Sequence, residues 1–261
     1  MPGFDLQLLL HGQYHDWLLA GLLVSLKLAA VTIACALPLA IVIALLRLAP
    51  VRALQWVGAT YVEVIRNVPL IAHLLFWYFG APELLPDKLK EWLYAGDYEF
   101  VAAAIGLTLY ASAFMAENIR SGIRAIPAVQ FEAARALGLG FIPAMRRVVL
   151  PQALRVTVPS LLSQVIILWN DTSIATVIGL GELMNKAARV ESAVFRSAEA
   201  FSFATLSYLG GSLTLMAVAA WIHRRWPVRT LCWLMRLSLP TTITMPLVPV
   251  MLTGTRSLSG S

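Results

Sequence analysis

Apolar residues gather in five stretches along the chain, separated by shorter polar segments. The stretches cover residues 20–46, 54–79, 100–116, 154–180 and 201–222. Each is close to the ~20 residues that a helix needs to cross a bilayer. Backbone groups that face lipid must be hydrogen-bonded within their own segment, so each stretch is expected to be a helix. The pattern therefore predicts an all-α membrane protein with five transmembrane helices.

Charged side chains between these stretches orient the chain. The first stretch is followed by Arg47 and Arg52, and the third by six arginines against one glutamate. The segment between the second and third stretches carries five acidic residues against two lysines. Because positively charged loops stay in the cytoplasm, the N-terminus is predicted outside and the C-terminus inside. Residues 1–17 are then a periplasmic segment, residues 18–225 the transmembrane permease domain and residues 226–261 a cytoplasmic tail.

The composition agrees with a membrane protein. Hydrophobic residues make up 59% of the chain and charged residues 13%, against roughly a quarter charged in an average soluble domain. The net charge is +6, but the basic residues gather in loops on one side, so membrane lipid is expected as a partner and nucleic acid is not. Cys35 lies in the first apolar stretch and Cys232 in the basic tail, so neither a disulfide nor a metal site is expected.

One polar loop, residues 127–151, contains residues that typically begin and end helices. Residues 130–137 and 141–149 are each predicted to form a short helix. Gly138 can supply the left-handed conformation that ends the first helix, and Pro151 is expected to close the second. Small side chains near Gly138 would let the backbone of a partner approach closely.

The same loop carries a recognisable pattern: Glu132-Ala133-Ala134, three residues, Gly138, nine residues, then Val148-Val149-Leu150-Pro151. This pattern resembles the EAA loop of bacterial importer permeases of the ATP-binding-cassette (ABC) class. The resemblance implies a type I ABC importer permease fold, in which the loop is a cytoplasmic coupling helix docked in a groove of the ATPase subunit. It also implies that Glu132, Ala133, Ala134 and Gly138 contact the ATPase. The alternative is an ordinary connector with incidental alanines.

The second stretch contains charged residues, which are costly inside a membrane and usually functional. Glu63 and Arg66 are three residues apart, so they can pair on one helical face. Pro69 removes a backbone hydrogen bond and can break the helix, and broken helices in transporters expose polar backbone to a central pathway. Arg66 and Asn67 are therefore candidate pathway residues, and the alternative is a structural Glu63–Arg66 pair near the cytoplasmic end.

The fourth stretch contains four consecutive polar residues: Asn170, Asp171, Thr172 and Ser173. Polar groups in an apolar environment need partners or water. One or two of them could be hydrogen-bonded between helices, which is common for Ser and Thr in membranes. Four in a row indicate instead a polar pathway for substrate.

The second and fourth stretches also resemble one branch of the ABC permeases. The run Y-x-E-x-x-R-N-x-P-L at residues 61–70, followed by aromatic residues at 76–79, is similar to permeases for polar amino acids and looks most like those for glutamate and aspartate. His73 stands where glutamine is common, and Asn170 stands where lysine is common. The resemblance implies that the substrate is glutamate, aspartate or one of their amides.

Motifs for catalysis are missing from the sequence. It contains no GxxxxGK[ST] phosphate-binding loop and no nucleophile–base set, so no cofactor is expected and ATP hydrolysis is expected in a separate chain. By resemblance, the partners are an ABC ATPase dimer, a second permease subunit (identical or paralogous) and a soluble amino-acid-binding protein outside a bacterial plasma membrane. Two rivals are an ion-coupled secondary transporter, in which Asp171 would serve the ion, and a membrane-embedded enzyme.

Overall fold

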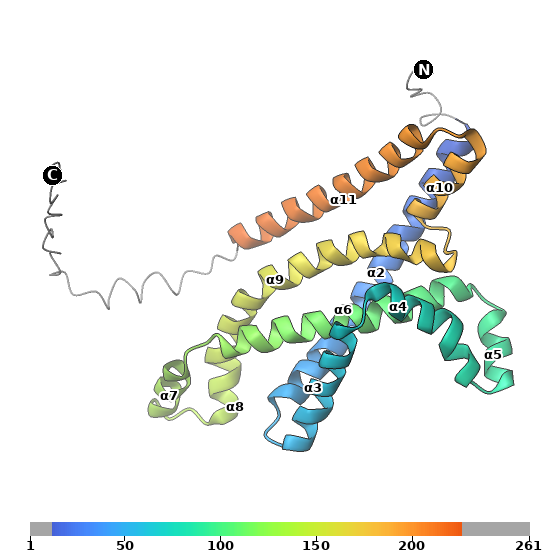
Figure 1. Cartoon of the computed structure of the whole chain (residues 1–261). Helices are drawn as coiled ribbons and strands as arrows, with labels where there is room; N and C mark the ends of the chain where they lie inside the picture. The colour runs from blue at the N-terminus through green and yellow to red at the C-terminus, as the bar shows by residue number, and fades with distance from the viewer. Residues whose placement is uncertain (1–11, 226–261) are drawn as a thin grey trace, which may run out of the picture. The chain divides into compact units, whose positions relative to one another are not determined.

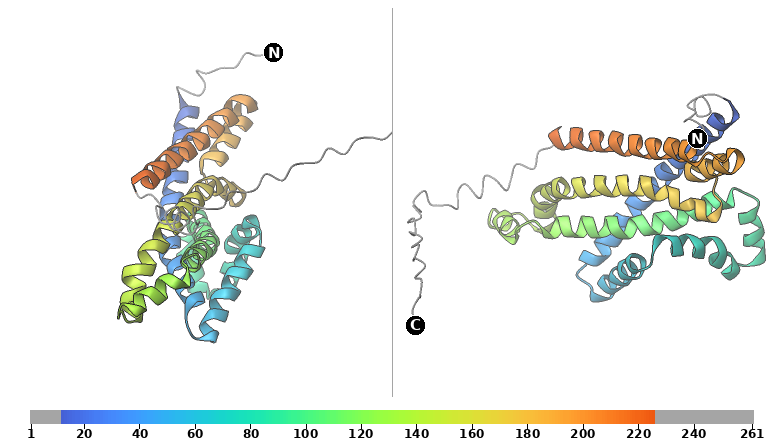
Figure 2. Two further views of the ribbon diagram at one scale, coloured as in Figure 1. Left: turned by 90° about the vertical axis from the view of Figure 1, so that its left-hand side faces the viewer. Right: turned by 45° about the horizontal axis from the view of Figure 1, so that its top comes forward.

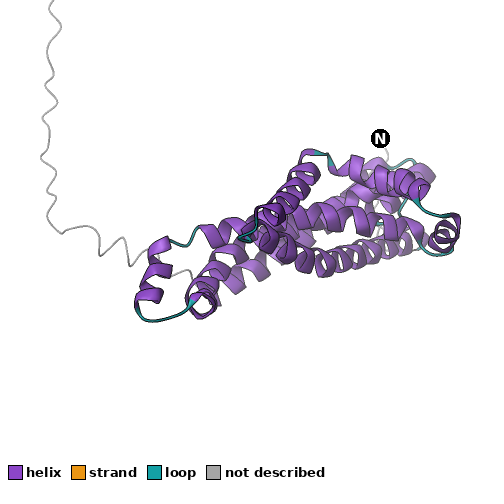
Figure 3. Ribbon diagram, turned by 90° about the horizontal axis from the view of Figure 1, so that it is seen from below, coloured by secondary structure: helices purple, strands orange, loops and turns teal. Residues whose placement is uncertain are grey.

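The computed structural model describes residues 12–225 (Figure 1). The predicted cytoplasmic tail, 226–261, and the first eleven residues lie outside the described part. Every element within residues 12–225 is helical (Figure 3). In chain order the elements are α2 (Gln13–Leu48), α3 (Arg52–Asn67), α4 (Leu70–Leu75), η1 (Phe76–Gly80), η2 (Ala81–Leu84), α5 (Asp87–Tyr94), α6 (Tyr98–Arg124), α7 (Ala128–Ala136), α8 (Phe141–Ala144), η3 (Met145–Val149), α9 (Leu150–Asp171), η4 (Thr172–Ile178), α10 (Leu183–Val194) and α11 (Ser197–Arg225).

Four helices of the described part are long and apolar enough to cross a membrane, and a fifth crossing exists if one bent pair counts as a single span. The four are Gln13–Leu48, Tyr98–Arg124, Met145–Ile178 and Ser197–Ile222. The predicted set of five spans is confirmed in this sense. The helices run beyond the apolar stretches, and α2 already begins at Gln13.

The second crossing is bent by 103° between α3 and the helical segment that starts at Leu70. Pro69 has no N–H group and cannot continue the hydrogen-bond ladder of α3. Val68, the residue before it, has extended backbone (φ −103°, ψ 131°), as expected before a proline. The predicted break at Pro69 is therefore confirmed.

Helix α6 is the centre of the packing and contacts α2, α3, α4 and α9. Its buried side consists largely of small residues, which let membrane helices approach closely. They include Ala102, Ala103, Gly106, Ala111, Ser112, Ala113 and Ala116. At Gly122 the approach of α9 is so close that a Cβ atom would lie 1.9 Å from the Thr157 hydroxyl oxygen. Helix α9 in turn lies between α6 and α11 (Figure 2).

A smaller core holds α10 against the beginnings of α2 and α11. Its buried members are Leu18, Leu183, Ala187, Val190, Ala200 and Ala204. Glu182 precedes α10 and caps it, because its carboxylate accepts hydrogen bonds from the N–H groups of Met184 and Asn185, both at 2.8 Å. The hydroxyls of Ser25 on α2 and Tyr208 on α11 donate to the same carboxylate at 3.3 and 2.8 Å. This fully buried carboxylate therefore ties three helices together.

The first prediction concerns this carboxylate, because burial raises the pKa of Glu182 above its ordinary value while the hydrogen bonds to it oppose that rise. A folded-state pKa above the unfolded one means that stability falls as the pH rises from the ordinary carboxyl range to the folded pKa. Glu182→Gln should remove that pH dependence of the unfolding temperature. Glu182→Ala should cost about 1–2 kcal/mol because the cap is lost.

Thermal unfolding of the detergent-solubilised chain, followed by circular dichroism across this pH range, measures both effects. Glu83→Gln is the matched control, since the Glu83 side chain is 71% exposed and its carboxylate pairs only with Lys90 in the described structure. An unchanged pH dependence in Glu182→Gln would show that Glu182 does not titrate with folding.

Candidate functional site

The polar loop folds as an elbow, residues 128–149, that joins α6 to α9. Its first helix, α7, ends in a Schellman-type cap. The Gly138 N–H donates to the Arg135 carbonyl at 2.9 Å, and the Leu139 N–H donates to the Ala134 carbonyl at 3.1 Å. Gly138 has φ +82°, a conformation that side chains other than glycine rarely adopt. The role of Gly138 in ending the first helix agrees with the prediction.

The outward face of the elbow carries mostly small side chains and one large apolar side chain. Glu132, Ala133 and Gly138 are exposed, and Leu137 is 83% exposed. Ala134 is only 3% exposed, on a helix that packs against η3. Three of the four predicted contact positions thus face outward in this chain, whereas Ala134 supports the elbow from inside. Leu137 was missed, although an apolar residue directly before the closing glycine was a usable signal.

The second half of the elbow runs into the fourth crossing without a break. Helix α8 continues through the π-helical η3, where the Leu150 N–H bonds to the Met145 carbonyl five residues earlier, and then into α9. Pro151 lies in the first turn of α9, where its missing N–H is tolerated. The prediction that Pro151 closes the second helix is therefore wrong, because the wider π-helical turn carries the chain past the proline.

The polar residues at the end of α3 are exposed on this chain, and Glu63 and Arg66 do not form the structural pair that was the alternative to a pathway role. No Glu63–Arg66 ion pair occurs among the described residues. Instead, the Asn67 side-chain amide donates to the Glu63 carbonyl at 2.7 Å. The central carbon of the Arg66 guanidinium lies 4.9 Å from the centroid of the Phe114 ring on α6, which is a cation–π contact. Arg66 therefore takes part in no ion pair within the described part of the chain, and the carboxylates within electrostatic reach of it include that of Glu117.

His73 supplies a hydrogen-bond partner at the helix break that Pro69 causes. The Ile65 carbonyl would normally accept a hydrogen bond from the residue four positions later, but that residue is Pro69. The Nε2 atom of His73 lies 3.1 Å from this carbonyl oxygen, and the ring is buried edge-on against Tyr110, with centroids 5.9 Å apart. A glutamine amide could make the same bond, which explains why His73 fits where the resemblance expects glutamine.

The four polar residues of the fourth crossing differ in burial. The α-helix tightens there into the 3-10 helix η4. Asn170 is exposed and accepts a hydrogen bond at 3.1 Å from Ser212 on α11. Asp171 and Ser173 are half-buried. Thr172 is fully buried, and its hydroxyl donates to the Trp169 carbonyl at 2.8 Å. That the four line a pathway stays a prediction, and Thr172 has no exposed surface in the described chain.

An aromatic face of α6 brings the second and fourth crossings together. Tyr110 lies within electrostatic reach of both Arg66 and Asp171, and its ring packs 4.9 Å from that of Phe114. The structure thus places one cation and one carboxylate beside the same pair of aromatic rings, whereas Asn170 faces α11. Tyr110 and Phe114 were missed, since two aromatic residues one helical turn apart usually belong to a core.

Nearer the elbow, Glu117 on α6 pairs with Arg120, whose Nε donates at 2.9 Å. Arg47 on α2 pairs with the same carboxylate. The Glu117 carboxylate therefore links α6 to α2. Within residues 12–225, no group of three or more His, Cys, Asp or Glu side chains could hold a metal ion.

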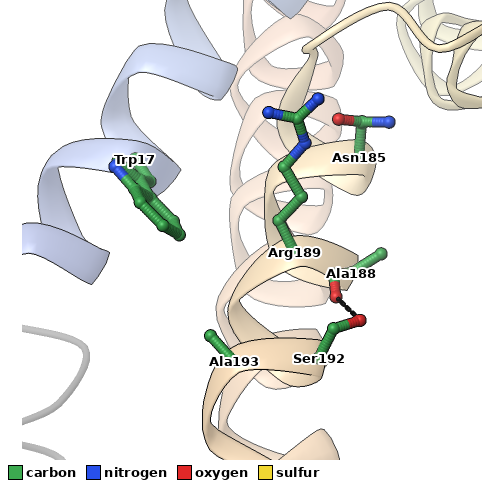
Figure 4. A pocket seen from close by; sticks show the side chains of 6 residues that line it. All are labelled: Trp17, Asn185, Ala188, Arg189, Ser192 and Ala193. Carbon is green, nitrogen blue, oxygen red and sulfur yellow. Dashed lines mark hydrogen bonds between the residues drawn. The ribbon is translucent and has the colours of Figure 1, made fainter.

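At the opposite end of the bundle a shallow pocket of about 460 Å³ lies between the start of α2 and α10. Trp17 faces the exposed side of α10 across it (Figure 4). The α10 side is lined by small or polar residues and one exposed arginine: Asn185, Ala188, Arg189, Ser192 and Ala193. The pocket thus combines an aromatic ring with a cation that no ion pair of the described residues neutralises.

Residues 36–227 match the family described as the binding-protein-dependent transport system inner membrane component. The chain is 36% identical over 223 residues to the probable amino-acid ABC transporter permease protein PatM of Vibrio harveyi, covering 85% of this chain and 96% of that protein. It is 34% identical to the arginine transport system permease protein ArtQ of Bacillus subtilis (80% and 92% covered). It is 33% identical to the glutamate/aspartate import permease protein GltJ of Escherichia coli K12 (81% and 88%).

Solved structures show the same arrangement of helices. A chain of an amino acid ABC transporter crystallised with histidines aligns with a TM-score of 0.73 at 30% identity, covering 81% of this chain and 95% of that chain. A chain of the inward-facing MetNI methionine ABC transporter aligns with a TM-score of 0.66 at 20% identity, which supports the fold alone. The fold is that of the type I ABC importer permeases.

Proposed function

The chain belongs to the family of inner membrane components of binding-protein-dependent transport systems, and from this premise we propose that it is the permease subunit of an ATP-driven amino-acid importer. The observation that carries the proposal is the combination of an exposed elbow with unpaired polar groups inside the membrane crossings. Relatives over 80–85% of the chain are named as amino-acid permeases, which supports amino acids as the transported class.

A second permease subunit is proposed to complete the pathway. Arg66 lies 14 residues beyond Arg52 at the start of α3, which corresponds to roughly 21 Å of helix. This depth is well inside a hydrocarbon core of about 30 Å. Glu63, Arg66 and Asn67 are nevertheless exposed on the single chain, and charged groups at that depth almost always face a bundle interior or a water-filled cavity. A second subunit opposite this face would create that interior.

The elbow is proposed to dock on a separate ATPase subunit. The exposed Glu132, Ala133 and Gly138 form a small surface that a partner groove can approach, and Leu137 adds an apolar side chain to bury. Because the elbow is continuous with α9, a movement imposed on it reaches the fourth crossing directly. Ala134 contributes by fixing α7 on η3.

The pocket between Trp17 and α10 is proposed to lie outside the cell and to receive the amino-acid-binding protein (Figure 4). The loop charges place this end opposite the elbow. An aromatic ring beside an arginine is a common anchor in protein interfaces.

The proposed topology gives a second prediction. A cysteine in place of the exposed Lys88 should react with a membrane-impermeant thiol reagent added to intact cells, and a cysteine in place of Arg146 in the elbow should react only after the cells are opened. Cys35 and Cys232 are replaced by serine beforehand, so that the reagent can label only the introduced cysteine. The opposite labelling pattern would refute the N-outside orientation and the docking of the elbow in the cytoplasm.

The substrate is proposed to be an acidic or amide amino acid, held at the aromatic face of α6. Every free amino acid carries a carboxylate and an ammonium group, and the unpaired charges of Arg66 and Asp171 complement the two. The exposed Asn67 and the half-buried Ser173 add hydrogen-bonding groups near this face, and Asn170 adds one on the side of α11.

Competition for uptake tests the substrate class. The complex is reconstituted with its ATPase and its own binding protein, and uptake of a labelled amino-acid mixture is measured against an excess of each unlabelled amino acid. Glutamate, aspartate, glutamine and asparagine should compete, and uptake should require ATP. Competition by arginine or histidine alone would refute the acidic or amide assignment and leave the permease function standing. ATP-independent uptake that follows an ion gradient would instead support a secondary transporter.

A further inference from the structure

An apolar groove runs between α2, α6 and α9, away from the aromatic face of α6, and has a volume of about 370 Å³. Its lining is almost entirely aliphatic. It includes Ile41, Leu45, Ile123, Leu150, Leu154 and Leu161. The one polar residue that lines it, Thr157, donates its hydroxyl to the Ala153 carbonyl at 2.8 Å. The groove therefore offers no free hydrogen-bonding group, and its occupant must be apolar.

The length of the groove corresponds to one leaflet of a bilayer. Along α9 it extends from Leu150 to Leu161, which is roughly 16 Å at 1.5 Å per residue. This is about half of a hydrocarbon core of ~30 Å. Leu150 directly follows the elbow, so the groove opens at the elbow end and stops near the middle of the membrane. The close crossing of α6 and α9 at Gly122 and Thr157 closes its floor.

Three arginines are close in sequence to residues that line the elbow end of the groove. Arg124 follows Ile123 on α6, Arg147 lies three residues before Leu150, and Arg155 follows Leu154. All three arginines are exposed, and none takes part in an ion pair within residues 12–225. Arg47 is also at this end, but Glu117 neutralises it. Exposed arginines that no ion pair of the described residues neutralises thus lie close in sequence to the elbow end of an apolar groove.

We propose that this groove binds an anionic phospholipid of the cytoplasmic leaflet. One acyl chain fills the groove along α9, and the phosphate group lies among Arg124, Arg147 and Arg155. Basic pockets between transmembrane helices on the cytoplasmic side are a known way to bind acidic headgroups. The site is separate from the aromatic face of α6, and its occupancy does not depend on which solute is transported.

The experiment uses the full chain in nanodiscs made from phosphatidylcholine and phosphatidylglycerol, and native mass spectrometry of the lipid retained after detergent extraction. We expect phosphatidylglycerol to be retained in preference to phosphatidylcholine. The double variant Arg124→Gln/Arg155→Gln should reduce this retention more than tenfold, since each arginine near an anionic surface changes affinity about fivefold. Arg52→Gln, which removes an exposed arginine at the same side of the membrane, is the matched control and should retain the lipid.

Filling the groove tests its role separately from the charges. Leu154→Trp should displace the bound lipid, whereas Leu213→Trp, at an exposed position of α11, should not. Equal retention of both lipids by the unaltered chain would overturn the anionic-lipid assignment, and retention unaffected by Leu154→Trp would overturn the groove. A Leu154→Cys chain that cross-links to a second copy of itself would show that another subunit fills the groove and would overturn the proposal as well. The experiment measures retained lipid and not transport, so a negative result does not contradict the proposed transport function.

Discussion

Gly138→Arg should abolish uptake while leaving the chain inserted in the membrane. Gly138 adopts φ +82°, so a side chain there strains the cap of α7. A Cβ atom at this position would meet nothing within 4 Å in the isolated chain, so the arginine would project into the space that a docked ATPase occupies. Substrate-stimulated ATP hydrolysis and uptake should fall by at least tenfold, and the amount of chain in the membrane should stay the same.

Two controls separate docking from folding. Gly138→Ala imposes the same backbone strain without the long charged side chain, and it should retain most of the uptake. Gly96→Arg adds the same charge at an exposed glycine of the opposite loop and should be close to normal. Co-purification of the ATPase is the direct measurement. A Gly138→Arg chain that still binds the ATPase and transports normally would exclude this surface as the docking site.

Arg66→Gln should reduce uptake by about tenfold to a hundredfold. A hydrogen bond between charged groups contributes about 1.5–3 kcal/mol, and Arg66 is the cation at the aromatic face of α6 that no described ion pair neutralises. Glutamine keeps some hydrogen bonding on a shorter side chain but removes the charge proposed to meet the substrate carboxylate. Uptake by the reconstituted complex measures the effect, and ATPase activity without substrate shows whether the subunits still assemble.

Arg52→Gln is the matched control for this variant. It removes an exposed arginine from the other end of α3 and should leave uptake nearly unchanged. Equal losses in the two variants would indicate a general effect of charge on insertion. Normal uptake by Arg66→Gln would remove Arg66 from the pathway.

The features that sequence predicts well are local. Five apolar stretches, the break at Pro69 and the closure of α7 at Gly138 each depend on a few neighbouring residues, and the structure contains all three. The elbow needed only the spacing of Glu132 and Gly138, because a helix end is determined by its own cap.

The features that sequence missed depend on contacts between distant segments or on small changes in helical winding. Thr172 is buried because the α-helix tightens into η4 at that residue, which no periodicity reveals. His73 bonds to Ile65, eight residues earlier, only because Pro69 leaves a carbonyl without a partner. Tyr110 is a candidate pathway residue only because α3 and η4 both approach α6. A single sequence does not show which distant segments contact each other.

The passage of the chain past Pro151 gives the fourth crossing a mechanical property. Met145–Ile178 forms one helical path of 34 residues, a rod roughly 50 Å long with the elbow at one end and η4 at the other. A tilt of about 6° at the elbow would move the far end of a rigid rod by about 5 Å, which is close to one helical turn. Pro159, inside α9, is the position where such a lever would bend first, because its missing N–H weakens the rod there. The stiffness of α9 at Pro159 would therefore determine how much of a movement at the elbow arrives at Asp171.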